Sequence, residues 1–265
     1  MQPRKGFVSI DGLRIHYREW GDPALPDVLL VHGWATSSLL WHDVAEALSA
    51  DSHLVAPDNR GNGESDVPES GYELARYAAD VLDLSESLGL QRPAFVGNSW
   101  GANIGTYLAA EHPAAFGRFL LEDPVYRKME DAFATVVPDV LARRERAEAD
   151  LRADAEARGL QGDALERDVY LATHFLPHAL EQVSTVNRSW ALECDAFLAR
   201  IAAPTLVLVA DEHAGGYISA DDLEHHRAAA ADMVEFRLWK GVGHLMHAEQ
   251  PERFLEELRR FLAQT

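Results

Sequence analysis

The sequence predicts an α/β fold with a mostly parallel central sheet flanked by helices. Short aliphatic runs recur along the chain, and such continuous runs are typical of strands that are buried on both faces. Segments with apolar residues at helical spacing lie between these runs, and this alternation favours parallel βα units. The expected strands cover residues 28–31, 53–56, 94–96, 119–121, 205–209 and 234–239.

The first residues predict a β-hairpin at one edge of this sheet. Two short apolar runs, 7–10 and 13–17, flank the dipeptide Asp11-Gly12. Both residue types tolerate the positive φ of a tight turn, so the dipeptide is a strong hairpin signal. The hairpin therefore adds antiparallel strands to an otherwise parallel sheet.

Helices are expected at residues 40–48, 74–88, 102–110 and 251–262. In the second of these, apolar residues recur on one face, and Gly89 follows as a C-cap. Pro251 suits the first position of the last helix, where the missing N–H group of proline costs nothing.

Residues 124–203 interrupt the alternation because they contain no strand-like run. The composition of residues 143–158 is mainly Ala, Arg, Glu, Asp and Leu, which is typical of a helix with a wide solvated face. Further helices are expected around 165–174 and 180–192. We interpret 124–203 as a helical cap, or lid, that is inserted into a core formed by 1–123 and 204–265.

The composition limits the partners and the location of the protein. The 265 residues include 24 Lys and Arg against 43 Asp and Glu, a formal net charge of −19. Such an acidic surface repels phosphate backbones and anionic lipid headgroups, so we expect neither nucleic acid nor a membrane as partner. The single cysteine, Cys194, cannot build a disulfide framework and lies beside acidic residues, which disfavours a catalytic role. With no signal-peptide pattern and no apolar membrane span, a cytoplasmic location is expected, and the oligomeric state stays open.

A candidate nucleophile follows the expected strand 94–96. The segment Gly97-Asn98-Ser99-Trp100-Gly101 has the G-x-S-x-G spacing and precedes a helical pattern. In a strand–turn–helix context this spacing holds the serine on a strained turn and exposes its hydroxyl. The alternative interpretation is an ordinary glycine-rich turn between a strand and a helix.

A serine hydroxyl needs a base and a group that stabilises an oxyanion. The candidate base is His244, which follows Gly241-Val242-Gly243 after the last expected strand. The candidate oxyanion donors are the backbone N–H groups of Trp34, after His32-Gly33, and of Trp100, the residue after Ser99.

Together these motifs resemble the α/β-hydrolase fold superfamily over nearly the whole chain. The matching segments are 32–33 (His-Gly), 58–65 (Asp-Asn-Arg-Gly-Asn-Gly-Glu-Ser), 97–101, and 243–244 (Gly-His) before 249–252 (Glu-Gln-Pro-Glu). The resemblance implies that Asp58 and Arg60 are scaffold residues of a loop near the site. The serine at position 99 sets this chain apart from relatives that use aspartate there, the haloalkane dehalogenases and soluble epoxide hydrolases.

The resemblance leaves two places for the acid that would orient His244. Family members usually carry it after the penultimate strand, where this chain has Ala-Asp-Glu-His at 210–213, so that Asp211 matches the usual glutamate and His213 the usual aspartate. Other members carry it after the strand that follows the nucleophile helix, where this chain has Glu122-Asp123-Pro124. We favour Asp123 over Asp211, with Glu122 third. Asp123 has the alternative role of capping the first cap helix.

The resemblance implies a serine hydrolase that cleaves a carboxylic ester or lactone of a small hydrophobic or aromatic molecule. Two alternatives stay open: a C–C bond hydrolase of ring-cleavage products, because Gly97-Asn98-Ser99 looks like the elbow of those enzymes, and a non-catalytic ligand receptor. No cofactor or metal is implied, since His225-His226 lacks the i, i+4 spacing of paired ligands. Several aromatic residues either line the pocket or pack the cap on the core: Trp34, Trp41, Trp100, Tyr126, Phe133, Tyr170, Phe175 and Trp190.

Overall fold

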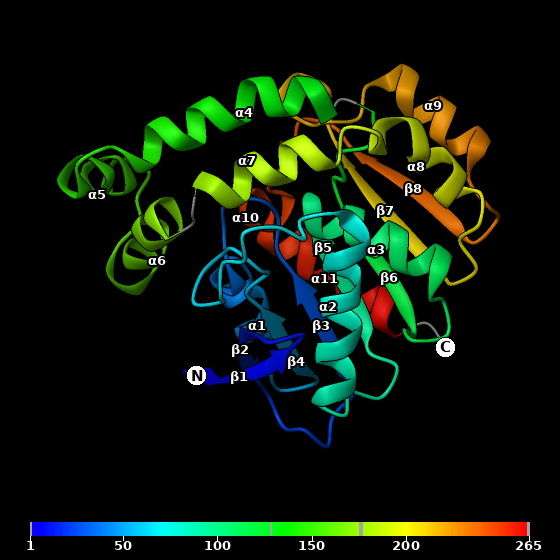
Figure 1. The fold of residues 1–265 in the computed structure, drawn as a ribbon, viewed down its shortest axis with the longest axis horizontal. Helices are drawn as coiled ribbons and strands as arrows, with labels where there is room; N and C mark the ends of the chain where they lie inside the picture. Colours follow the sequence, from blue (N-terminus) through cyan, green and yellow to red (C-terminus); the bar gives the residue numbers. More distant parts are fainter. Residues whose placement is uncertain (1, 128, 175–176, 264–265) are drawn as a thin grey trace.

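The computed structural model describes residues 2–127, 129–174 and 177–263, without the side chains of residues 129–133, 135 and 136. The described residues form an eight-stranded sheet in the order β1-β2-β4-β3-β5-β6-β7-β8 (Figure 1). Strands β1 and β2 pair antiparallel, as do β2 and β4, and the remaining pairs are parallel. The expected α/β class is confirmed. The strands are β1 (Arg4–Ile10), β2 (Leu13–Trp20), β3 (Asp27–Val31), β4 (His53–Pro57), β5 (Ala94–Asn98), β6 (Arg118–Glu122), β7 (Thr205–Ala210) and β8 (Val234–Trp239).

The N-terminal hairpin is confirmed at the sheet edge. Ile10 pairs with Leu13 across the turn, and Asp11 and Gly12 both adopt positive φ values, 49° and 80°. The sequence signal was reliable here because only a few residue types accept that backbone conformation without strain.

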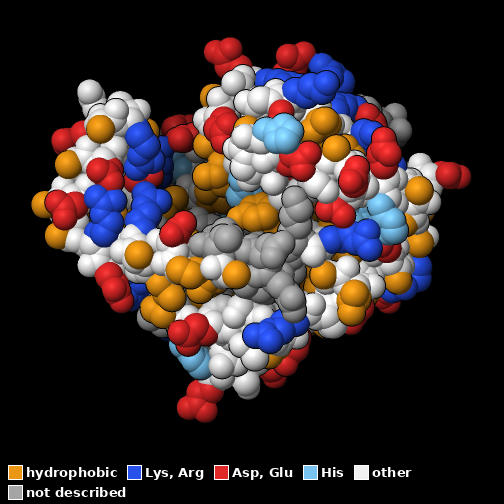
Figure 2. Space-filling view, turned by 90° about the horizontal axis from the view of Figure 1, so that it is seen from above, with side chains coloured by type: hydrophobic (Ala, Val, Ile, Leu, Met, Phe, Trp, Pro, Cys, Tyr) orange, Lys and Arg blue, Asp and Glu red, His pale blue; other side chains and the backbone are white. Residues whose placement is uncertain are grey.

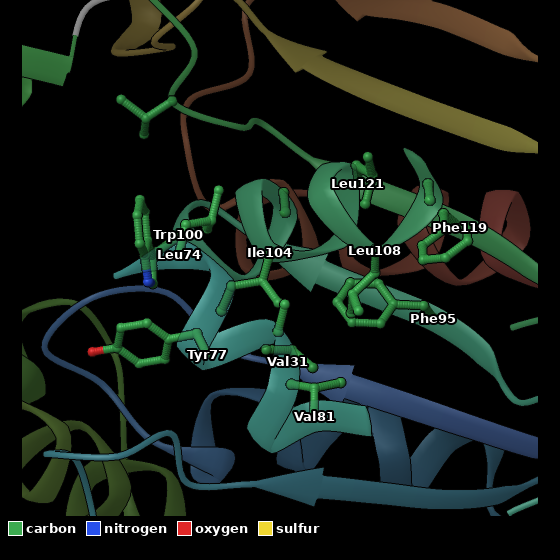
Figure 3. Close-up of a cluster of buried hydrophobic side chains, with 14 of the residues drawn as sticks. Val31, Leu74, Tyr77, Val81, Phe95, Trp100, Ile104, Leu108, Phe119 and Leu121 are labelled. Carbon is green, nitrogen blue, oxygen red and sulfur yellow. The ribbon is translucent and has the colours of Figure 1, made fainter. Parts of the chain in front are cut away.

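Two helical layers cover the sheet. Apolar residues of α1 (His42–Leu48), α10 (Met246–Glu249) and α11 (Pro251–Leu262) form a core on one face, together with those of the short 3-10 helix η1 (Ser38–Trp41). On the other face lie α2 (Leu74–Ser87), α3 (Trp100–Glu111) and α9 (Ala220–Ala229). Figure 3 shows the second core, in which side chains of α2 and α3 meet those of the strands: Val31, Leu74, Tyr77, Val81, Phe95, Trp100, Ile104, Leu108, Phe119 and Leu121.

Five helices lie between β6 and β7 in the described part of the chain, along the top and the left of Figure 1. They are α4 (Met129–Arg144), α5 (Glu148–Ala157), α6 (Gly162–Thr173), α7 (Pro177–Val186) and α8 (Trp190–Leu198). We call them the α4–α8 segment. Within it, α5 packs on α6 through a small apolar cluster: Leu151, Ala155, Leu165, Val169 and Ala172.

Two of the expected helices in this segment are wrong in extent. The helix expected at 143–158 is broken, since α4 ends at Arg144, Ala147 is extended and α5 starts at Glu148. The break lets α5 turn back onto α6, and a composition good for helix cannot reveal such a turn. The helix expected at 180–192 is also two helices, separated at the buried Asn187. Its side chain donates to the Tyr72 carbonyl and accepts from the Leu74 N–H group, which ties the break to the start of α2.

The parallel strands end at one edge of the sheet, and the residues singled out in the sequence follow those ends. Gly33 lies after β3, Ser99 after β5, Asp123 after β6 and His244 after β8. In the described residues, no helix combines the length and the apolar character that crossing a bilayer requires.

Candidate active site

Ser99 occupies a strained turn between β5 and α3. Its backbone has φ 55° and ψ −116°, a conformation that costs energy for a residue with a side chain. The turn is held from both sides, because the Ser99 N–H group donates to the Glu122 carbonyl (2.9 Å) and the Ser99 carbonyl accepts from the Asn103 N–H group (3.1 Å). The hydroxyl-bearing residue is thereby fixed at the carboxyl edge of the sheet, at the N-terminus of α3.

The two glycines of the G-x-S-x-G segment are required by close backbone approach. A Cβ on Gly97 would lie 2.5 Å from the Gly101 backbone, and a Cβ on Gly101 would lie 2.1 Å from the Val31 carbonyl oxygen. Any side chain at these positions would push α3 away from the sheet. The motif therefore works through tight packing of the strand, the turn and the helix.

Gly33 brings the loop after β3 against Ser99. A Cβ on Gly33 would lie 2.9 Å from the Ser99 Cβ, so only glycine permits this approach. The indole rings of Trp34 and Trp100, the residues after Gly33 and Ser99, lie with centroids 5.5 Å apart. The two residues whose N–H groups the sequence singled out are thus neighbours beside the serine.

The structure brings His244 and Asp123 together. The His244 Nδ1 atom lies 2.6 Å from the Asp123 Oδ2 atom, and the Asp123 carboxylate is fully buried. The same carboxylate accepts hydrogen bonds from the N–H groups of Ala210 (3.1 Å) and Tyr217 (3.3 Å). In the described part of the chain the first helix after Asp123 is α4, which starts at Met129, six positions further on.

A side-chain clamp fixes the chain two residues after Asp123. The Asn103 amide of α3 donates to the Val125 carbonyl (2.9 Å) and accepts from the Val125 N–H group (3.0 Å). All three groups are buried. The acid is therefore anchored to the nucleophile helix before the chain enters the α4–α8 segment.

The two other candidate acids lie elsewhere. Asp211 accepts hydrogen bonds from the N–H groups of His213 and Gly241, which hold its pKa below the usual value. Glu122 is buried and accepts from both the backbone N–H group and the ring Nδ1 atom of His247. Each carboxylate thus has a structural partner of its own, and neither is the one beside His244.

A cavity of about 280 Å³ connects Ser99 and His244 to the α4–α8 segment. Trp34, Tyr217 and Leu245 form part of its core side. Its opposite wall comes from α4 and α6, with Val140, Arg143, Asp168 and Leu171. The Tyr217 ring stands edge-on to the His244 imidazole, with centroids 4.6 Å apart.

Asp58 anchors a buried network beneath the loop after β3. Burial alone raises its pKa, but a hydrogen bond from His16 (2.8 Å), the proximity of His32 and N–H donors from Glu64 and Ser38 hold it well below the usual value. His32 is fully buried, and this burial lowers its pKa. These hydrogen bonds hold the loop that contains Gly33 and Trp34 in place.

Arg60, the other expected scaffold residue, forms a buried ion pair with Asp80 of α2. Its Nε and Nη2 atoms each donate to one carboxylate oxygen at 2.6 Å. A guanidinium that is fully engaged in this way ties the 58–65 loop to α2.

Most of the aromatic residues noted in the sequence pack into the core. Trp41 lies in the core under α11, and Trp100, Tyr126 and Trp190 belong to the other core. Tyr170 stacks on His174. Of the described members of that set, Trp34 lines the cavity over Ser99. The side chains of Phe133 and Phe175 lie outside the described residues.

Tyr217 and Arg143 are cavity residues that sequence reasoning missed. Tyr217 belongs to no motif and follows Gly215-Gly216 in the sequence. A Cβ on Gly216 would lie 2.6 Å from the Ala210 carbonyl oxygen, so the close passage of this loop along the end of β7 was the available signal. Arg143 was one of several arginines in a solvated helix pattern.

Cys194, Asp195 and His226 bring possible metal-ligand atoms within 4.8 Å of one another in the described part of the chain. Asp195 is hydrogen-bonded to His225 and His226, which joins α8 to α9. Burial and the neighbouring Asp195 charge raise the pKa of the Cys194 thiol to about 12. This group lies outside the cavity over Ser99, and we assign no reaction to it.

A family model described as alpha/beta hydrolase fold matches residues 26–196. The chain belongs to this family. In this alpha/beta hydrolase the matched residues run from β3 through the Ser99 turn and the end of β6, and they include nearly all of the α4–α8 segment.

Named relatives of this alpha/beta hydrolase match part of its length. Epoxide hydrolase A of Mycobacterium tuberculosis is 36% identical over 105 residues, which are 38% of this chain and 33% of that protein. The 3-hydroxybutyrate-oligomer hydrolase of Cupriavidus necator is 38% identical over 128 residues, 46% of this chain and 44% of that protein. The matches therefore span less than half the length of these relatives.

A solved structure of E-2-(acetamidomethylene)succinate hydrolase superposes on this alpha/beta hydrolase with a TM-score of 0.85. The superposition covers 99% of this chain and 100% of that chain at 23% sequence identity. At this identity the likeness shows a common fold.

Proposed function

We propose that this alpha/beta hydrolase is a serine hydrolase that cleaves a carboxylic ester or lactone of a small molecule through an acyl-enzyme. The observation that carries the proposal is the 2.6 Å contact between His244 and the buried Asp123. His244 and Ser99 line the same cavity. A nucleophile, a base and an orienting acid are the parts that this chemistry requires.

In the proposed reaction, the Ser99 Oγ atom attacks the substrate carbonyl carbon while the His244 Nε2 atom takes the hydroxyl proton. The C–O bond to the leaving alcohol then breaks, and His244 returns the proton to that alcohol. Water, deprotonated by His244, attacks the acyl-enzyme and releases the acid and free Ser99. Asp123 holds the His244 ring in one tautomer and stabilises its positive charge.

The developing oxyanion requires hydrogen-bond donors. We assign this role to the backbone N–H groups of Trp34 and Trp100. Gly33 supports the assignment, since its contact with Ser99 brings the Trp34 loop to the nucleophile. Trp100 occupies the first position of α3, where N–H groups have no partner within the helix and the helix dipole favours negative charge.

Ester chemistry fits Ser99 better than epoxide opening does. A serine alkoxide that opens an epoxide forms an ether, and water does not release an ether under mild conditions. An ester intermediate, in contrast, is readily hydrolysed. The matched relatives include an epoxide hydrolase, but the residue at the turn of this chain supports acyl transfer.

We further assign residues 1–123 and 204–265 to the catalytic core and residues 124–203 to a cap. The cavity has one wall from each, which supports a substrate enclosed between them. A volume of about 280 Å³ suits a small molecule rather than a polymer chain.

The test compares the protein with Ser99→Ala on a panel of 4-nitrophenyl esters and a simple lactone. Turnover by the parent protein and its loss by about 10³-fold or more in the variant are expected. A fluorophosphonate probe should label Ser99 in the parent chain. Full turnover by Ser99→Ala would refute the proposal. Cleavage of a carbon–carbon bond in a ring-cleavage product, without turnover of any ester or lactone, would refute it as well.

A further inference from the structure

The cavity over Ser99 carries a positive charge on its α4 wall. Among its described lining residues, most are apolar or uncharged, and the side chains with a permanent charge are Arg143 of α4 and Asp168 of α6. A charged group is costly to place beside an apolar surface unless it has a partner. The partners of these two residues therefore determine the net charge of the wall and the hydrogen-bond donors that remain for a ligand.

Asp168 is already neutralised by another residue. Arg158 donates to both carboxylate oxygens of Asp168, at 3.0 and 2.6 Å, and Arg143 adds a hydrogen bond of 2.9 Å to one of them. The bidentate Arg158 pair is the stronger geometry. Two guanidinium groups thus share this carboxylate. The other acid near them, Asp154, pairs with Arg146, so one positive charge stays in excess in this cluster.

Arg143 is the member of the cluster that faces the Ser99 cavity. Arg158 lines a neighbouring cavity of about 470 Å³, and Asp168 lies between the two. The Arg143 side chain is 43% exposed, and within the described residues Asp168 is the acceptor found for its guanidinium. A guanidinium has five N–H donors, so Arg143 retains donors for a ligand.

The location of this charge is unusual for such an acidic chain. The protein has a formal net charge of −19, and on the lobe of α5 and α6, beside a hollow in the surface, basic side chains lie among acidic ones (Figure 2). A permanently charged, planar guanidinium fits a carboxylate with two parallel hydrogen bonds.

We propose that Arg143 binds a carboxylate of the substrate, so that the molecules cleaved at Ser99 are acidic esters or lactones. The simplest class is the half-ester of a short dicarboxylic acid, with the free acid against Arg143 and the ester carbonyl at Ser99. The inference rests on the proposed ester or lactone hydrolysis and narrows its substrate class.

The first experiment compares an anionic ester with a neutral one of similar shape. Monomethyl succinate and methyl 4-methylpentanoate differ in a carboxylate against an isopropyl group, and release of acid is followed in a pH-stat. We expect a higher kcat/KM for monomethyl succinate. Arg143→Gln should lower that value by about 30-fold, as expected for a lost charged hydrogen bond, and leave the neutral ester within about twofold.

Two variants control for charge and geometry. Arg260→Gln removes the same charge on α11, where Arg260 pairs with Glu256 outside the cavity, and should leave kcat/KM for both esters unchanged. Arg143→Lys keeps the charge without the planar fork and should restore part of the selectivity. Melting temperatures of all variants show whether loss of the Arg143–Asp168 ion pair destabilises the fold and lowers activity for that reason.

A second experiment measures binding without turnover. Calorimetric titration of Ser99→Ala with succinate should show binding that Arg143→Gln in the same background removes. Equal effects of Arg143→Gln on the two esters, or a preference for the neutral ester, would overturn the carboxylate site and leave ester hydrolysis standing. If neither these two esters nor the panel of 4-nitrophenyl esters and lactone is turned over, the proposed hydrolase function is contradicted. The succinate titration then tests by itself whether Arg143 binds a carboxylate.

Discussion

Asp123 and His244 are joined by a 2.6 Å hydrogen bond across 121 positions of sequence. One follows β6 and the other follows β8, and β7 lies between these strands in the sheet. The family's more usual place for an acid, after β7, holds Asp211 with partners of its own. Of the two carboxylates, Asp123 is the one that contacts His244.

Exchange of each acid for its amide separates the two candidates. Asp123→Asn is expected to lower kcat by about 10³-fold or more, because an amide no longer stabilises the charged His244 ring. The kcat of Asp211→Asn should stay within about threefold of the kcat of the parent protein. Steady-state kinetics on one chromogenic ester measures both, and a larger loss in Asp211→Asn would contradict the assignment of Asp123.

The Tyr217 ring is expected to position His244. Tyr217→Ala removes the edge-on ring contact and should lower kcat by about tenfold, since small displacements of a base are costly. Burial, with the Asp123 charge, raises the pKa of the Tyr217 hydroxyl to about 12, so it stays protonated at working pH. Tyr217→Phe should therefore keep both kcat and the pH–rate profile, and a loss there would instead assign a role to the hydroxyl.

Gly33 is expected to be essential for rate but not for folding. Gly33→Ala places a methyl group 2.9 Å from the Ser99 Cβ, which displaces the nucleophile or the Trp34 loop. A fall in kcat of about 10²-fold is expected, as for loss of an oxyanion donor. Circular dichroism and thermal unfolding serve as the control, and a variant with full activity would contradict the close approach.

Asp58 should make the stability of the fold depend on pH. The pKa of Asp58 in the folded state lies below the ordinary pKa of an aspartate. Its stabilising contribution is therefore complete above that ordinary pKa and is lost as the pH falls through the folded-state pKa. Asp58→Asn is expected to cost about 3 kcal/mol near pH 7, as for a broken buried ion pair. Urea unfolding of both proteins should show that this gap narrows below about pH 4, and a gap independent of pH would be inconsistent with the network described.

The sheet and the serine turn were predictable because local chemistry determines them. Asp11-Gly12 and the glycines around Ser99 accept backbone conformations or approaches that few residues permit. The aliphatic runs are too short for buried helices and suit strands that are covered on both faces. In these segments local preference and tertiary packing agree.

The breaks in the α4–α8 segment and the cavity wall were not predictable for the opposite reason. Asn187 ends α7 by bonding to Tyr72 and Leu74, more than a hundred positions earlier, and no pattern around Asn187 indicates this. Tyr217 and Arg143 likewise acquire their positions from loops and helices far away in sequence. Long-range contacts of single side chains leave no periodic signal.

The Asn103 clamp on Val125 has a mechanical consequence. Both hydrogen bonds lie between Asp123 and α4, so any displacement of α4 has to break them before it can shift the acid. We therefore expect substitutions within the α4–α8 segment to leave the contact between Asp123 and His244 in place.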